Sequence, residues 1–272
     1  GSVVGLDLTA TGVRVSGSIS RIALGAPGQG RIVFGPGEPN QVATTASEGV
    51  AFTLELDRQS GDLTASGPRV VTGDKGVAGF VPGNGDTAPS GAFAFGFVTR
   101  GGGSGSNLVD VGLPQPLDLT VNAAVALGYA PDGTPSWVRT LRRQGTNNPP
   151  DLWRVISTGD GGVVAAFSAG GAGNADQTFE LGDGMTVVEQ LTLRSHDILL
   201  ARFSATGALA SRFVVRSRTE RGVQELYDDG THFLVVGRAG SSFVFDGGGG
   251  SPVGLPRDAA YVARFDPATD RK

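Results

Sequence analysis

The stretch Asp197–Ser211, DILLARFSATGALAS, decides the fold class of this chain. An apolar run ends at an aromatic residue, and a polar turn with a glycine follows. Successive residues of a strand face opposite sides, and here both sets are apolar: Ile198 and Leu200 on one side, and Leu199, Ala201 and Phe203 on the other. We therefore expect a strand in a sheet that is covered on both faces.

The same unit recurs along the chain, which is typical of a repeat protein. Further copies begin at Val50 (VAFTLELDRQSGDLTA), Ala124 (AVALGYAPDGTPSW) and Ala259 (AAYVARFDPATD). The residues that end the apolar runs, here called anchors, are Leu56, Tyr129, Phe203 and Phe265, and the turn glycines are Gly61, Gly133 and Gly207, with Thr269 or Asp270 in the last copy. The second copy has Ala124 and Gly128 where bulkier residues are expected.

Two other elements alternate with this unit. One places Asp or Thr beside glycine, as tight turns with positive φ require, and then continues as a β-rich run; its copies start at Ala10, Gly73, Gly159 and Tyr227. The other is a short β-rich run that starts at Arg31, Ala92, Thr178 and Ser242. Nothing between them has a helical period.

These patterns predict an all-β protein, and specifically a β-propeller of about four repeats with roughly four strands each. Radially packed sheets cover both faces of a strand and protect its edges. We expect one domain over residues 1–272, which is either a small closed propeller or a segment of a larger one. A pair of β-sandwiches is the alternative fold.

Composition agrees with a turn-rich β protein and excludes several function classes. The chain of 272 residues has 45 glycines and 15 prolines, and its hydrophobic content of 39% supports a buried core. A net charge of −4 disfavours binding to nucleic acid or to anionic membranes. Cysteine is absent, so neither a disulfide nor a thiolate site is expected. No apolar run approaches the ~20 residues that span a bilayer.

The repeats resemble the bacterial SBBP-type β-propeller family, in which a strand D-x-F-V-A-K-L/F leads to a D-x-x-G turn, an L-x-W strand and later a D-G-x-x-Y-V-x-G strand. The matching positions are Asp197 to Phe203 with Gly207, Ala263 to Phe265, Trp137, Gly17 and Gly237. The resemblance implies a secreted or cell-surface bacterial protein, located outside the cell or in the envelope, without catalytic residues.

Carboxylates in glycine-rich loops are the candidate cation ligands. These are Asp160, Asp228, Asp229 and Asp246, and a structural calcium ion is the cation they would hold. None of the loops has the calcium-loop spacing with a later glutamate, and turn chemistry alone explains Asp-Gly pairs. We favour turn chemistry and expect no cofactor.

No catalytic constellation is visible in the sequence. A G-x-S-x-G elbow is absent, and His196 and His232 are the only histidines. Trp137 and Trp153 are predicted to pack in the core rather than to stack on a sugar. Arg139, Arg142 and Arg143 follow a strand-like run and are predicted to lie on a solvated strand edge.

We therefore expect a non-enzymatic, exported propeller domain that binds a protein or glycan through loops on one rim. An enzyme that acts on polysaccharide with carboxylates at the central channel is the first alternative. A purely structural array, in which this segment belongs with further repeats of a larger chain, is the second.

Overall fold

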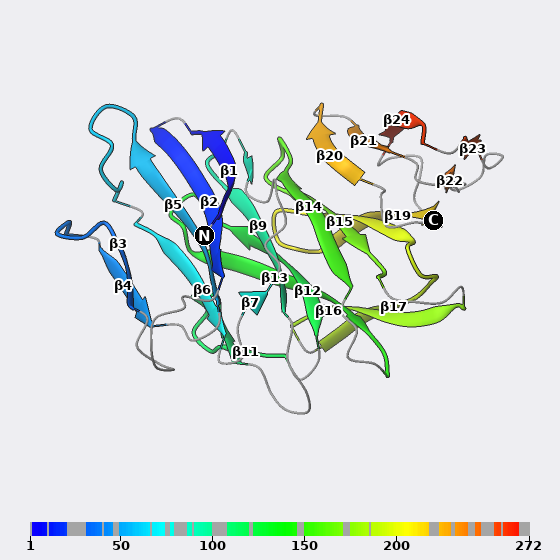
Figure 1. The fold of residues 1–272 in the computed structure, drawn as a ribbon, viewed down its shortest axis with the longest axis horizontal. Helices are drawn as coiled ribbons and strands as arrows, with labels where there is room; N and C mark the ends of the chain where they lie inside the picture. The colour runs from blue at the N-terminus through cyan, green and yellow to red at the C-terminus, as the bar shows by residue number, and fades with distance from the viewer. Residues whose placement is uncertain are drawn as a thin grey trace.

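The computed structural model describes residues 2–9, 11–20, 31–39, 41–45, 49–65, 67–73, 77–78, 86–88, 90–99, 108–119, 122–145, 150–170, 175–184, 186–217, 223–229, 232–238, 243–245, 253–256 and 258–266. Within these residues the chain is all-β, with strands joined into antiparallel sheets and no helix, as predicted (Figure 1). It follows that no described helix is long and apolar enough to cross a bilayer.

Four sheets form four successive units, and each unit is an antiparallel meander. The first contains β1 (Ser2–Leu8), β2 (Gly12–Ser20), β5 (Gly49–Asp57) and β6 (Arg69–Gly73). The second contains β7 (Val77–Ala78) and β8 (Asp86–Thr87), which both pair with β9 (Phe93–Thr99), then β12 (Ala123–Tyr129) and β13 (Pro135–Arg143). The third contains β14 (Asp151–Ser157), β15 (Val163–Ser168), β18 (Ile198–Phe203) and β19 (Leu209–Ser217). The fourth contains β20 (Val223–Asp228), β21 (Phe233–Arg238) and β24 (Ala260–Phe265).

A hairpin lies between the second and third strands of every unit. These insertion hairpins are β3 (Arg31–Phe34) with β4 (Val42–Thr45), β10 (Leu108–Asp110) with β11 (Leu117–Asp118), β16 (Gln177–Asp183) with β17 (Thr186–Leu193), and β22 (Phe243–Phe245) with β23 (Val253–Leu255). The last three pair with the preceding unit, so the sheets interlock along the chain. Three of the four insertion hairpins therefore join neighbouring units.

The four anchors occupy the same position in their sheets. Each is the last residue of the third strand or the one before it, and it pairs with the first residue of the second strand or with that residue's neighbour. The pairs are Leu56 with Val13, Tyr129 with Phe93, Phe203 with Val163, and Phe265 with Phe233. The turn glycines that follow the first three anchors have φ of +78° or +79°, because the chain reverses there in a conformation that L side chains rarely adopt.

The register shifts between strands also repeat. In the first, third and fourth units the first strand carries one extra residue at the same place, namely Val4, Trp153 and Gln224. In the second and third units an extra residue follows the start of the fourth strand, Ser136 and Ala210. β-bulges add twist at a fixed position, so their repetition means that the units share one twisted shape as well as one sequence pattern.

One part of the repeat assignment is wrong. The sequence pattern places the run that starts at Ala92 with the insertion runs at Arg31, Thr178 and Ser242, but this run forms β9, the second strand of its unit. Phe93 pairs with the anchor Tyr129 as Phe233 pairs with Phe265. The segment at Gly73 supplies only the end of β6 and the short β7. Two β-rich runs of similar composition do not reveal which strand of a unit each one forms, because that depends on the strands with which they pair.

Among the described residues the core consists of three apolar clusters, one at each junction between successive units. In β18, Leu199, Ala201 and Phe203 face the second unit, and Ile198 and Leu200 face the fourth. All five side chains are fully buried. The two-faced strand expected from the sequence is therefore confirmed, since the third unit is packed between two neighbours.

Candidate functional site

The turns that join the first and second strands carry most of the candidate metal ligands, and in the structure these side chains close the turns. Asp160 accepts a hydrogen bond from the Gly162 amide at 3.1 Å, and Asp229 accepts one from the His232 amide at 2.6 Å. Thr9 does the same for Gly12 in the first unit, at 2.8 Å. The repeated feature is thus an Asp, Ser or Thr side chain that caps the turn, which is ordinary turn chemistry.

The remaining candidate ligands are only partly brought together. Asp228 accepts a hydrogen bond from the Gly159 amide at 2.7 Å, which ties the turn of the fourth unit to that of the third. Asp246 lies outside the described residues. No group of three or more His, Cys, Asp or Glu side chains suited to a metal occurs among the residues that the structure describes. The predicted calcium site stays a prediction.

Each capped turn lies beside the residue that precedes the anchor on the third strand. In the third unit Arg202 forms an ion pair with Asp160 at 2.7 Å. In the fourth, Arg264 lies 2.7 Å from Nδ1 of His232. In the first, Glu55 accepts hydrogen bonds from Thr9 and Thr11. A polar side chain therefore joins turn and strand in three of the four units.

The second unit has Gly128 at this position and lacks such a side chain. The Trp137 indole lies over the glycine instead, since a Cβ built there would come within 2.3 Å of Trp137 Cε2. Beside it a cleft of about 350 Å³ opens between the second and third units. Small-molecule sites start at about this volume.

The walls of this cleft differ in chemistry. Aromatic rings come from the second unit, and the rings of Phe93 and Tyr129 are stacked with centroids 4.6 Å apart. Polar side chains come from both units: Ser90 and Ser136 from the second, and Ser157 and Asp160 from the third. Burial by itself raises the pKa of Asp160, but hydrogen bonds from Thr158 and the Gly162 amide and the charge of Arg202 outweigh it, so the pKa lies below its usual range. An apolar floor thus adjoins an ionised, half-exposed carboxylate.

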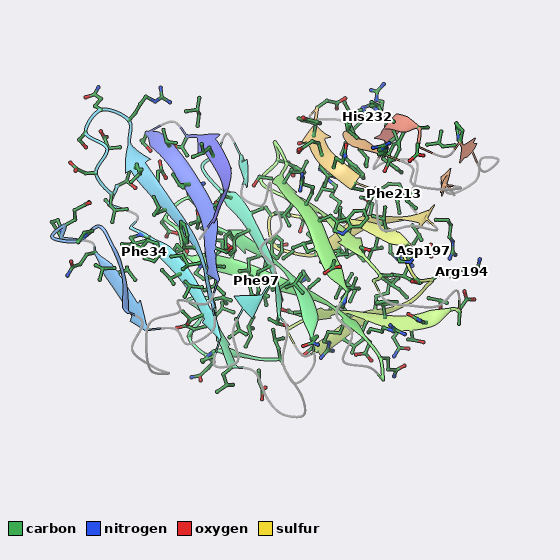
Figure 2. The ribbon with its side chains drawn as sticks, in the orientation of Figure 1. Phe34, Phe97, Arg194, Asp197, Phe213 and His232 are labelled. Carbon is green, nitrogen blue, oxygen red and sulfur yellow. The ribbon has the colours of Figure 1, made fainter. Side chains whose placement is uncertain are left out.

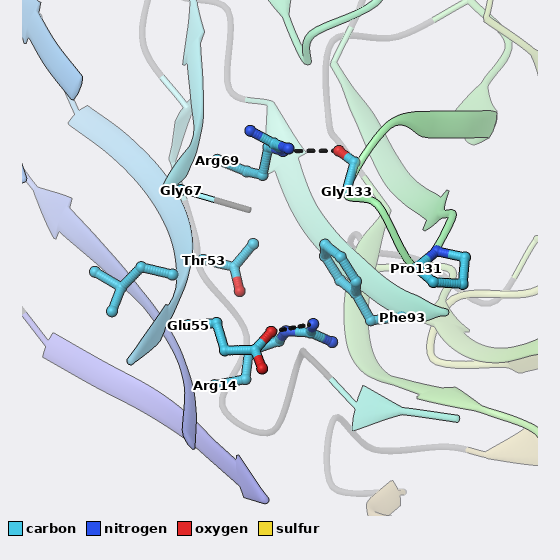
Figure 3. Close-up of a pocket in the computed structure, with 9 residues that line it drawn as sticks. Arg14, Thr53, Glu55, Gly67, Arg69, Phe93, Pro131 and Gly133 are labelled. Carbon is cyan, nitrogen blue, oxygen red and sulfur yellow. Dashed lines mark hydrogen bonds and ion pairs between the residues drawn. The ribbon is translucent and has the colours of Figure 1, made fainter. Parts of the chain in front are cut away.

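A second pocket lies between the first and second units but has room for little more than one water molecule, with a volume of about 10 Å³ (Figure 3). Its walls hold a buried ion pair between Arg14 and Glu55 at 2.9 Å, and the Arg14 guanidinium lies 4.0 Å from the centre of the Phe93 ring. Arg69 donates a hydrogen bond from Nε to the Gly133 carbonyl oxygen at 2.7 Å. These groups fill one another's hydrogen-bonding needs, so the pocket is a polar junction rather than a ligand site.

The prediction of a solvated arginine edge is wrong. β13 is covered on its outer edge by β16, so Arg142 is buried and pairs with Glu180 at 3.2 Å. Arg139 donates from Nε to the Gly207 carbonyl oxygen at 2.7 Å and pairs with Asp183. The sequence does not show that β13 has a partner on its outer edge, because that partner, β16, comes from the insertion of the next unit.

The prediction that both tryptophans pack in the core is confirmed. Trp137 is buried against Phe203 and Trp153 is half-buried against the cluster between the third and fourth units, so the core assignment is confirmed. No sequence signal marks Arg14 and Glu55 as partners in a buried ion pair. The small residue Gly128, where bulk is expected, is the sequence signal that leads to the cleft.

Comparison of the chain with protein-family models and with curated proteins finds no match.

Proposed function

We propose that this protein is a non-enzymatic domain of the propeller type that binds a short glycan in the cleft between its second and third units. The observation that carries the proposal is the substitution of Gly128 for the polar residue of the other three units, next to a cleft of about 350 Å³. The repeat thus departs from its own pattern at a residue that lines the cleft.

The chemistry of the cleft favours a saccharide. Sugar rings have apolar faces that pack on aromatic side chains, and hydroxyl groups that need hydrogen-bond partners. Phe93, Tyr129 and Trp137 line the cleft and form its apolar wall, although each is at most 6% exposed. Ser136 and Asp160 supply the hydrogen-bond partners. The Asp160 carboxylate accepts hydrogen bonds, and its partner Arg202 donates them.

The propeller arrangement is supported by the repeated meander and by the way each unit covers the next. An extracellular or envelope location rests on the family resemblance of the repeats. A protein ligand on the same rim is the second candidate, and Leu6 and Leu8 favour it because each is 71% exposed close to the Thr9 turn.

The test measures binding of a panel of short oligosaccharides by calorimetry and by tryptophan fluorescence. The fluorescence measurement uses a Trp153→Phe variant, which leaves Trp137 as the reporter. Ala205→Phe adds a ring at an exposed residue that lines the cleft, and we expect it to weaken binding at least about tenfold, or 1.4 kcal/mol. Gln59→Phe adds the same ring to the exposed turn of the first unit and serves as the control.

Binding that survives Ala205→Phe, or no binding by any saccharide in the panel, would overturn the proposal. Release of shorter saccharides from the bound ligand would instead favour the polysaccharide-cleaving alternative. Capture of a protein that Ala205→Phe does not displace would assign recognition to the Leu6 and Leu8 surface.

A further inference from the structure

The second strands of the four insertion hairpins differ in length. Among the described residues β4 has four residues, β11 has two, β23 has three, and β17 has eight. Natural sheets keep edge strands short, because a long unpaired edge can pair with another chain. β17 departs from this pattern of its own repeats, so its edge needs a separate explanation.

β17 lies at one end of the seven-stranded sheet, and β16 covers one of its edges. Among the described residues no strand pairs with its other edge, and β17 lies at the periphery of the molecule (Figure 1). The opposite end of the same sheet is β7, which has only two residues. β17 is in the interior of the sequence, and residues 175–184 and 186–217 around it are described.

The side chains of β17 favour contact with another strand. Val187 is 42% exposed and Val188 is 55% exposed. The strand contains no lysine, arginine or proline, which are residues that discourage pairing at an edge. Its single charged residue, Glu189, is neutralised within the same molecule, because Arg212 donates to it from Nε at 2.8 Å. β17 therefore presents apolar side chains without an uncompensated charge, so two copies of it do not repel each other.

We propose that β17 pairs in antiparallel fashion with β17 of a second copy of this chain, around a two-fold axis at Gln190. A two-fold contact uses the same surface on both subunits, and an added strand gains main-chain hydrogen bonds along the edge. The pairing places Gln190 opposite Gln190 of the second copy, and Val188 opposite Thr192 of the second copy.

Charge and exposure select this register over its neighbours. An axis at Glu189 would place two carboxylates directly opposite each other, which is destabilising. An axis at Leu191 would place Val188 opposite Arg194, which lies beyond the end of β17. An axis at Val188 would lie on the extra residue between the pairs of Leu181 and Gly182 with β17. At Gln190 each side-chain amide can both donate to and accept from the other.

Single-cysteine variants test the register directly, since the chain has no cysteine. Opposite residues of antiparallel strands have Cα atoms about 5 Å apart, which a disulfide can bridge. Gln190→Cys should therefore form a covalent dimer under mild oxidation. Thr192→Cys is the matched control, because Thr192 is also exposed on β17. Its two copies would lie about 13 Å apart, which is too far for a disulfide.

Sedimentation of the 272-residue chain should show a reversible dimer. Val188→Lys should raise the Kd of the dimer at least about tenfold, because a lysine on an edge strand opposes pairing. Val262→Lys changes a valine of β24 that is 69% exposed, and it should leave the Kd unchanged.

A chain that sediments as a monomer at every concentration would overturn the proposal. A dimer that Val188→Lys does not weaken would do the same, as would one that Gln190→Cys cross-links no faster than Thr192→Cys. These measurements do not involve the cleft, so their outcome is independent of glycan binding.

Discussion

The indole of Trp137 lies against the backbone of Gly207, and a Cβ built on that glycine would come within 2.5 Å of Trp137 Cγ. Trp137 belongs to the second unit and Gly207 to the turn after the third anchor, so the contact joins two units. Glycine is needed at position 207 for two reasons. A side chain would collide with the indole, and the φ of +78° is one that other residues rarely adopt.

We predict that Gly207→Ala is far more destabilising than Gly61→Ala. Both glycines occupy the same turn position with nearly the same φ, so each substitution costs about 1 kcal/mol in backbone strain. Nothing lies within 4 Å of the Cβ position at Gly61. The clash with Trp137 adds about 1–3 kcal/mol at Gly207. Denaturant unfolding of the two variants measures the difference, and equal losses would contradict the packing account.

Glu55 should make stability depend on pH in the acid range. Burial alone raises its pKa, but hydrogen bonds from Thr9 and Thr11 and the charge of Arg14 outweigh that effect and lower it. A carboxylate with a lowered folded-state pKa stabilises the protein above the ordinary glutamate pKa of about 4.3, and this is lost as pH falls through the folded value.

Glu55→Gln should therefore be less stable than the wild type at pH 7, and the gap should narrow below about pH 4. Urea unfolding at a series of pH values measures it. Glu225→Gln, which removes a half-exposed carboxylate paired with Arg154, is the control and should follow the wild-type profile. A gap that stays constant from pH 7 to pH 3 would show that Glu55 acts through shape rather than charge.

Asp197 supports the corner before β18 from a buried position. Its carboxylate accepts a hydrogen bond from the Arg194 amide at 2.9 Å and pairs with Arg216 at 2.7 Å, while its side chain is 1% exposed (Figure 2). We predict that Asp197→Ala costs about 3 kcal/mol, because the Arg194 amide and the partly exposed Arg216 lose their partner.

Asp176→Ala is the matched control for Asp197→Ala. Asp176 also pairs with an arginine at 2.7 Å, Arg194, but both side chains are more than half exposed. Solvent screens such pairs, so we expect no change in the thermal midpoint. Loss of equal size in the two variants, measured by calorimetry, would contradict a role for burial.

Phe213 ties the third unit to the fourth. Its ring contacts those of Phe233 and Phe265 at centroid distances of 5.3 and 5.0 Å. Phe213→Ala should cost about 3–5 kcal/mol, and amide exchange should rise first in β20, β21 and β24, since these strands lose their apolar cover. Leu8→Ala, at an exposed position of β1, should leave both quantities unchanged. Uniform loosening of all four units would contradict a local junction.

Much of the fold was predictable because the signals are local. The two-faced pattern of Ile198 to Phe203 marks a covered strand, and the positive φ at Gly61, Gly133 and Gly207 follows from turns that need glycine. The Ala92 run was misplaced because β-rich segments differ in their partners and hardly in their composition. In the sequence only Gly128 indicates the cleft, and the effect of this glycine depends on which residues lie beside it in the fold.

The sequence by itself determined the strand periodicity, the four anchors and the turn chemistry, since each arises from residues close together in the chain. The tertiary structure decided which unit covers which. It buried Arg142 by placing β16 on β13, and it opened a cleft beside Gly128. These features depend on contacts between residues that are distant in sequence, and a local pattern carries no information about the distant partner.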